Sequence, residues 1–161
     1  MGNKKREESL CCNYFRQAVE STADIAGGFR NGLQALGKNS EKVSADDTKK
    51  LSGSVDIDAC TRDLYPEDSR WDYAIGYENL SYFVEVHPAN TSNVREMIKK
   101  ANWLRRWLDE KASALKSISG DSVFYWIPSG KCAIAPGSPQ SRMLAGSKIR
   151  IVSPLRFPLQ K

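Results

Sequence analysis

The middle of the chain alternates between apolar and polar residues, whereas the segments on either side repeat their apolar residues every three or four positions. Alternation over residues 53–58 predicts one strand, and the apolar runs at 71–77 and 81–86 predict two more. Asn79 lies near the middle of the turn between the last two runs, which favours an antiparallel hairpin. Pro88 is expected to end the third strand, because proline cannot donate a hydrogen bond to a sheet. This region therefore predicts a three-stranded meander.

Helical periodicity precedes and follows the meander. Residues 8–37 predict an N-terminal helical layer with an interruption at Gly27-Gly28. Residues 92–117 predict an amphipathic helix, and this segment is long enough to connect two parallel strands. Its apolar stripe consists of Val94, Met97, Ile98, Ala101, Leu104, Leu108, Ala112 and Leu115.

The remaining segments differ from these in composition and periodicity. Residues 38–50 are rich in Lys, Ser, Glu and Asp and show little periodicity, which predicts a mobile surface connection that contributes no core. The aromatic run at 122–127 predicts a fourth strand that is closed by Pro128. Residues 136–145 and 149–152 then predict a short helix and a last strand.

Together these elements predict an α/β fold with a mixed β-sheet flanked by helices, in the order α-β-β-β-α-β followed by a short helix and a last strand. The 161 residues fit one domain (1–161), in which residues 51–161 form an α/β core and a basic C-terminal tail. No run approaches the roughly 18 apolar residues of a membrane span, and the charged start lacks the apolar stretch of a secretory signal. We therefore expect a cytoplasmic protein with no membrane partner.

The four cysteines, Cys11, Cys12, Cys60 and Cys132, include no CxxC spacing. They therefore indicate neither a zinc site nor a disulfide framework. We expect reduced thiols on small buried side chains.

Positive charge is concentrated near the C-terminus. Six of the 24 Lys and Arg residues lie in residues 122–161, where no Asp or Glu occurs, so the first 121 residues hold 18 bases against 19 acids. Such an asymmetry is what a polyanion-binding face requires, because neutralising phosphates releases counterions. A solubilising surface explains it equally well.

Two acidic residues stand within the predicted meander, Asp72 between Trp71 and Tyr73, and Glu85 in the run Glu85-Val86-His87. If the strands pair, both carboxylates reach the same sheet edge, where they can hold one divalent cation. An unpaired carboxylate in an apolar run is costly, so each acid needs a metal or a basic side chain as its partner. A structural ion pair is the alternative to a metal site.

The element order and the spacing from Asp72 to Glu85-Val86-His87 resemble the PD-(D/E)XK nuclease superfamily, over roughly residues 10–127. The resemblance implies that Asp72 and Glu85 are catalytic metal ligands for Mg²⁺ or Mn²⁺, and that Glu20 on the first helix is an additional acid. It implies a hydrolase, an Mg²⁺-dependent endonuclease that binds DNA and cleaves its phosphodiester bonds.

His87 stands where the motif of that superfamily has Lys. Histidine can act as a general base or ligate a metal, but it lacks a permanent ammonium charge. The missing cation is expected from Lys99 or Arg95 on the following helix. As an alternative, a lone histidine at a strand end is often a hydrogen-bonded structural residue.

Other candidate residues have both a functional and a structural interpretation. Asp56 and Asp58 are a second pair of acidic candidates, although capping a turn is the more frequent role for such residues. Trp103 and Trp107, four residues apart, either stack on bases or pack in the core, and core packing is the more frequent outcome. The cations expected to hold a nucleic-acid backbone are Arg95, Lys131, Arg142, Lys148 and Arg150.

Two further functions remain open at this stage. A nuclease-like fold without catalysis would serve as a binding or regulatory module in a larger assembly, and the missing motif Lys favours it. An unrelated α/β interaction domain, with its acids in salt bridges, is the third hypothesis.

Overall fold

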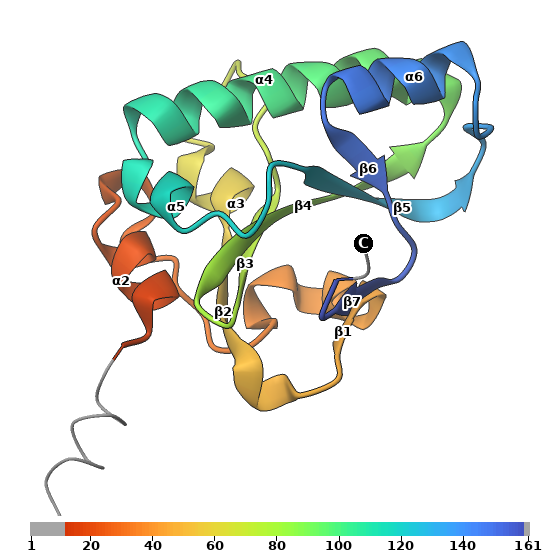
Figure 1. Cartoon of the computed structure of the whole chain (residues 1–161). Coiled ribbons are helices and arrows are strands. Elements are labelled where there is room, and N and C mark those ends of the chain that lie inside the picture. Colours follow the sequence, from red (N-terminus) through yellow and green to blue (C-terminus); the bar gives the residue numbers. More distant parts are fainter. Residues whose placement is uncertain (1–11, 160–161) are drawn as a thin grey trace, which may run out of the picture.

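A five-stranded mixed sheet organises the computed structural model, which describes residues 12–159 (Figure 1). Its strands are β2 (Leu51–Asp56), β3 (Tyr73–Tyr77), β4 (Leu80–Ala89), β5 (Phe124–Cys132) and β6 (Ile149–Ile151). They lie in the order β2-β3-β4-β5-β6, the pairs β2–β3 and β3–β4 being antiparallel and the pairs β4–β5 and β5–β6 parallel. The α/β class with a mixed sheet and flanking helices is confirmed.

The hairpin between β3 and β4 turns at Glu78 and Asn79, which both adopt positive φ angles, of 50° and 62°. Two consecutive left-handed residues give the turn that matches the twist of paired strands. The prediction that Pro88 ends its strand is wrong, because β4 continues to Ala89. The register shifts between His87 and Ala89, and such an irregularity tolerates a residue that has no N–H to donate.

Strand β5 also continues past its proline, Pro128, as far as Cys132. Beyond β5, the sequence predicts the short helix and the last strand of the sheet well. They are α6 (Pro139–Gly146) and β6. Pro139 begins α6, where its missing N–H costs nothing, and Ser138 caps that helix by accepting the N–H of Ser141.

Helix α4 (Val94–Glu110) crosses the sheet between β4 and β5, with the shorter α5 (Ser113–Ser117) after it. Figure 1 shows α4 and α6 running across the same side of the sheet. The single helix expected over 92–117 is therefore divided after Glu110. The two tryptophans of α4, Trp103 and Trp107, are buried and stacked, with ring centroids 5.7 Å apart, so they pack in the core as the structural alternative predicts.

The N-terminal layer is shorter and more irregular than a helix over 8–37, of which residues 8–11 lie outside the described part. It contains α2 (Tyr14–Glu20), the 3-10 turns η1 (Ala23–Ile25) and η2 (Gln34–Lys42), and later the short helix α3 (Ile57–Thr61). Gly37 has a φ of 54° and breaks η2. A residue in the left-handed region cannot continue a right-handed helix.

Residues 38–50 are not a coreless connection. They include β1 (Val43–Ala45) and η3 (Thr48–Lys50), and β1 pairs in parallel with β7 (Leu155–Phe157). Val43 and Phe157 are buried in a cluster that covers the sheet face opposite α4. The prediction of no core there is wrong, because a three-residue strand is too short to show periodicity.

Cysteine chemistry also departs from expectation. Cys12 is disulfide-bonded, which contradicts a reduced thiol, whereas Cys60 and Cys132 are free. Cys132 is exposed rather than buried, and Cys11 lies outside the described residues. Across residues 12–159, no helix has the length and apolar character to cross a bilayer.

Candidate functional site

Two hydrogen bonds, one to the carboxyl of Asp72 and one to that of Glu85, join the start of β3 to β4. The backbone N–H of Asp72 donates to Oε2 of Glu85 at 2.8 Å, and the N–H of Val86 donates to Oδ2 of Asp72 at 3.1 Å. The antiparallel register that pairs Tyr73 with Val84 places these residues opposite one another. The two acids singled out in the sequence therefore meet at one place in the fold.

Lys100 completes this group from α4. Its ammonium binds Oε1 of Glu85, whose side chain is 0% exposed, and the Lys100 side chain is itself only 15% exposed. Both oxygens of Glu85 are thus engaged. A carboxylate buried this deeply requires such a partner, because desolvation of an isolated charge is costly.

Lys99, the cation expected from the sequence, is exposed and borders a different groove on α4. The sequence nevertheless contains a signal for Lys100. Met97 and Leu104 face the core, and Lys100 lies three residues after the first and four before the second. That spacing places Lys100 along the helix face that covers the sheet.

Both acids bind protons more tightly than usual. Burial, and then the nearby Asp72 carboxylate, raise the pKa of Glu85 to about 8, and Lys100 opposes this shift. Burial also raises the pKa of Asp72 to about 6, again against the effect of Lys100. Two carboxyls facing one ammonium leave an excess of negative charge only when both are ionised, and the raised pKa values reflect the cost of that state.

Lys100 keeps its charge. Burial alone would lower the pKa of its ammonium, but the Glu85 carboxylate more than offsets this effect, with a further contribution from Asp72, and the pKa is raised. The group thus combines two carboxyls with a fixed cation.

His87 borders the pair. Its Nδ1 is 3.9 Å from Oε1 of Glu85, and its side chain is 25% exposed. Burial and then the Lys100 charge lower the pKa of the imidazole, so His87 is neutral at pH 7. Its backbone carbonyl accepts the indole N–H of Trp126 at 3.0 Å, which fixes the strand at this point.

Asp56 and Asp58 have structural partners. Asp56 caps α3 by accepting the N–H of Ala59 at 2.8 Å, so the capping alternative describes it. Asp58 pairs with Arg70 at 2.9 Å and with Arg62 at 3.2 Å. Both acids act on the charge of the site, because each raises the pKa of Asp72 slightly.

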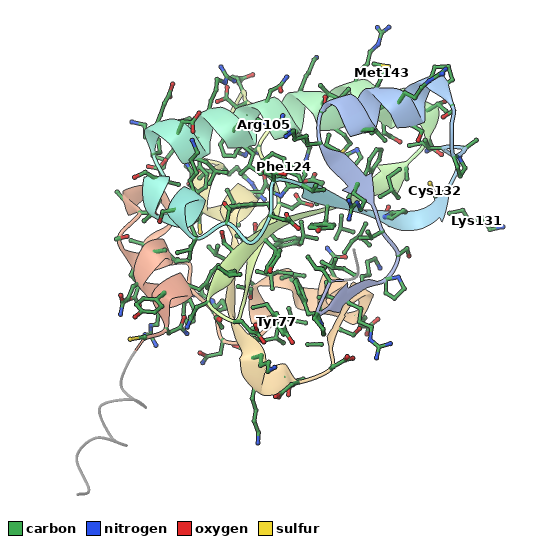
Figure 2. The ribbon with its side chains drawn as sticks, in the orientation of Figure 1. Tyr77, Arg105, Phe124, Lys131, Cys132 and Met143 are labelled. Carbon is green, nitrogen blue, oxygen red and sulfur yellow. The ribbon has the colours of Figure 1, made fainter. Side chains whose placement is uncertain are left out.

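The other predicted residues are dispersed. Glu20 is exposed at the end of α2 and pairs with Arg16 at 2.8 Å. The five cations expected to contact a nucleic acid, Arg95, Lys131, Arg142, Lys148 and Arg150, are all exposed but stand on separate elements. Figure 2 shows Lys131 at the outer end of β5, beyond the part of the sheet that α4 covers.

This pair offers few side chains to a divalent cation, and both oxygens of Glu85 are already engaged. No group of three or more His, Cys, Asp or Glu side chains in the described residues has an arrangement that could hold a metal. Mg²⁺, however, is often held by one or two carboxylates and completes its shell with water and phosphate oxygens. Oδ1 of Asp72 accepts no hydrogen bond from residues 12–159.

Comparison with protein-family models, curated proteins and solved structures found no match for the chain.

Proposed function

We propose that this protein is a divalent-metal-dependent nuclease that hydrolyses phosphodiester bonds in DNA. The observation that carries the proposal is the convergence of the Asp72 and Glu85 carboxyls with the Lys100 ammonium. Carboxylate oxygens are the ligands that Mg²⁺ and Mn²⁺ prefer. An ammonium beside them complements the negative oxygens of a phosphate group.

Each residue then has a role. Asp72 and Glu85 would hold the metal, which when bound polarises the phosphate and activates water. Lys100 holds the Glu85 carboxylate in place and supplies the cation that His87 cannot. The neutral imidazole of His87, at the margin of the group, accepts a proton from the attacking water.

A catalytically inactive nuclease-like module in a larger assembly is the second candidate. It is favoured by the full burial of Glu85 and by the engagement of both its oxygens, which is also how a purely structural ion pair looks. In that case the Lys100–Glu85 pair fixes α4 on the sheet and takes no part in chemistry.

Metal binding and cleavage separate the two candidates. Calorimetry with Mn²⁺ and Mg²⁺, and cleavage of plasmid DNA in the same ions, would be measured on wild type, Asp72→Asn and Glu85→Gln. The exposed Asp63→Asn is the matched control. We expect wild type and Asp63→Asn to bind metal and cleave, and both site variants to lose cleavage by at least about 10²-fold. Wild-type protein that binds DNA but neither binds metal nor cleaves the plasmid would establish the inactive module instead.

The contribution of the dispersed cations is tested through salt. The affinity of catalytically silent Asp72→Asn for duplex DNA would be measured between low and moderate salt, with and without Arg142→Gln. Each lost phosphate contact should reduce the slope of log affinity against log salt by about 0.9. Lys49→Gln, another exposed cation, is the control and should leave the slope unchanged.

A further inference from the structure

A second concave site lies at the other edge of the sheet. It is a cavity of about 660 Å³ between the end of β5, α6 and β6, and none of the residues that line it belongs to the Asp72–Glu85 group. Cavities of roughly 300–1,000 Å³ are the size that proteins use for small molecules. Its apolar floor includes the buried side chains Ile134, Leu144 and Ile149.

The charge around this cavity is of one sign. Lys148 and Arg150 line it, no Asp or Glu does, and neither cation forms an ion pair within residues 12–159. The nearby Asp121 is engaged by the hydroxyl of Tyr125. By contrast, the groove on α4 that is bordered by Lys99 also contains Glu67 and Asp68.

Lys148 is held in an uncommon conformation. Its φ is 56°, and hydrogen bonds from its N–H to Ala145 and from the N–H of Phe124 to its carbonyl fix the backbone on both sides. Few residues other than glycine adopt this region. The backbone of this cavity-lining cation is thus fixed rather than left to a flexible loop.

We propose that this cavity binds a small organic anion in which a phosphate or carboxylate is joined to an apolar or planar body of about nucleotide size. Lys148 and Arg150 would bind the anionic group, since a guanidinium and an ammonium both pair with such oxygens. The hydroxyls of Ser122 and Ser141 line the same space and supply further donors. The apolar floor would cover the body of the ligand.

This proposal does not depend on nuclease activity, because the cavity shares no residue with the metal-binding candidates. It concerns reversible binding only. Loss of metal binding in Asp72→Asn should leave the cavity unaffected, and Ala145→Phe, which keeps both cations, should weaken anion binding and leave cleavage unaffected. The two proposals therefore fail separately.

The cavity contains its own reporter. Cys132 lines it and carries a free, exposed thiol, which Figure 2 shows at the outer end of β5. Cys60, the other free thiol within residues 12–159, does not line it and is an internal reference. A ligand in the cavity should slow alkylation of Cys132 relative to Cys60, as read by mass spectrometry of the intact chain and its peptides.

The probes are adenosine monophosphate and octanoate, with adenosine and octanol as uncharged counterparts. We expect one of the two anions to protect Cys132 from alkylation at a concentration at least about tenfold lower than its uncharged counterpart requires. Whichever anion protects shows whether the cavity prefers a phosphate or a carboxylate. Protection by the neutral compounds at the same concentration would overturn the proposal. So would protection by a DNA oligonucleotide when neither small anion protects.

Two independent variants test the two parts of the site. Lys148→Asn with Arg150→Gln removes the charges, and Asn tolerates the left-handed backbone at position 148. Ala145→Phe leaves the charges and directs a larger side chain into the cavity. Each should weaken protection by the anion at least about tenfold. Unchanged protection in either folded variant contradicts the assignment.

Discussion

The ammonium of Lys100 binds the buried carboxylate of Glu85, across the contact between α4 and the centre of the sheet. This pair brings a cation to the place where Asp72 also lies, because the same Glu85 side chain accepts the N–H of Asp72. A group of this kind stabilises the fold less than its contacts imply, since two of its three charges have the same sign. Such costs are common where function requires them.

Asp72→Asn should stabilise the protein at neutral pH. The pKa of Asp72 is raised from 3.8 to about 6 in the fold, so the folded state retains a proton that the unfolded chain has lost. The associated stability is present below about pH 4 and is lost as the pH rises through about 6. We expect the variant to match wild type near pH 4 and to exceed it by about 1–3 kcal/mol at pH 8.

Urea denaturation at a series of pH values measures this difference. Asp63→Asn, an exposed substitution of the same chemistry, should change stability by less than about 0.5 kcal/mol at every pH. Equal pH dependence in wild type and Asp72→Asn would show that Asp72 is not held in a costly environment.

Lys100→Met should destabilise the fold by about 1–3 kcal/mol at pH 9, because the ionised Glu85 carboxylate of the wild type is there stabilised by a cation that the variant lacks. The loss should be smaller at pH 5. Glu85 already has a pKa raised to about 8 by burial and by Asp72, and removing Lys100 raises it further, so at acid pH the side chain is neutral. The measurement is urea denaturation at both pH values.

Lys99→Met is the matched control for that variant, since Lys99 is its exposed neighbour. It should cost no more than about 0.5 kcal/mol. Adding Glu85→Gln to Lys100→Met should recover part of the loss. If Lys99→Met lost as much stability as Lys100→Met, the burial of Lys100 beside Glu85 would not explain the effect.

His87→Gln should lower the rate of DNA cleavage by about 10²-fold without changing metal affinity, because it removes a base and no proposed ligand. Single-turnover rates across pH 5–8 give the test. Burial and Lys100 lower the pKa of His87 below its usual 6.5, so the wild-type rate should rise with pH at the acid end of this range and the variant should lack that rise. A variant that cleaves at the full rate assigns His87 a structural role only.

Phe157→Ala should cost about 3–5 kcal/mol, because a fully buried ring is removed from the cluster opposite α4. Phe157 stacks on Tyr77 with ring centroids 4.9 Å apart. Thermal and urea unfolding measure the loss. Met143→Ala, at a side chain that is 45% exposed, should be nearly neutral by comparison, and a similar cost for both would contradict the burial of the C-terminal strand.

The predictable parts of this fold are those that depend on local pattern. Alternation and the turn at Asn79 located the meander, and the long apolar stripe located α4. The meeting of Asp72 and Glu85 followed from the same reasoning, because pairing of their two strands brings both acids to one place. Strand ends were less predictable, because a shift in register allowed β4 to pass through Pro88.

What the sequence did not reveal depends on contacts between distant residues. Strands β1 and β7 have three residues each, and nothing within either segment shows that they pair. Lys99 and Lys100 are adjacent and point in different directions from α4. The packing of the helix on the sheet, rather than charge, decides that Lys100 reaches Glu85. The cavity is likewise formed between the end of β5, α6 and β6, and none of these segments indicates a cavity by its own sequence.

The pairing of β1 with β7 also has a consequence for synthesis on the ribosome. Asp46, just after β1, binds Arg156 in β7, 110 positions further along, so every residue up to β7 must emerge before this contact can form. Until then, one side of the sheet keeps its aromatic surface uncovered. The nascent protein is consequently exposed to aggregation and to chaperones until β7 has emerged, and that strand completes the protection of this face.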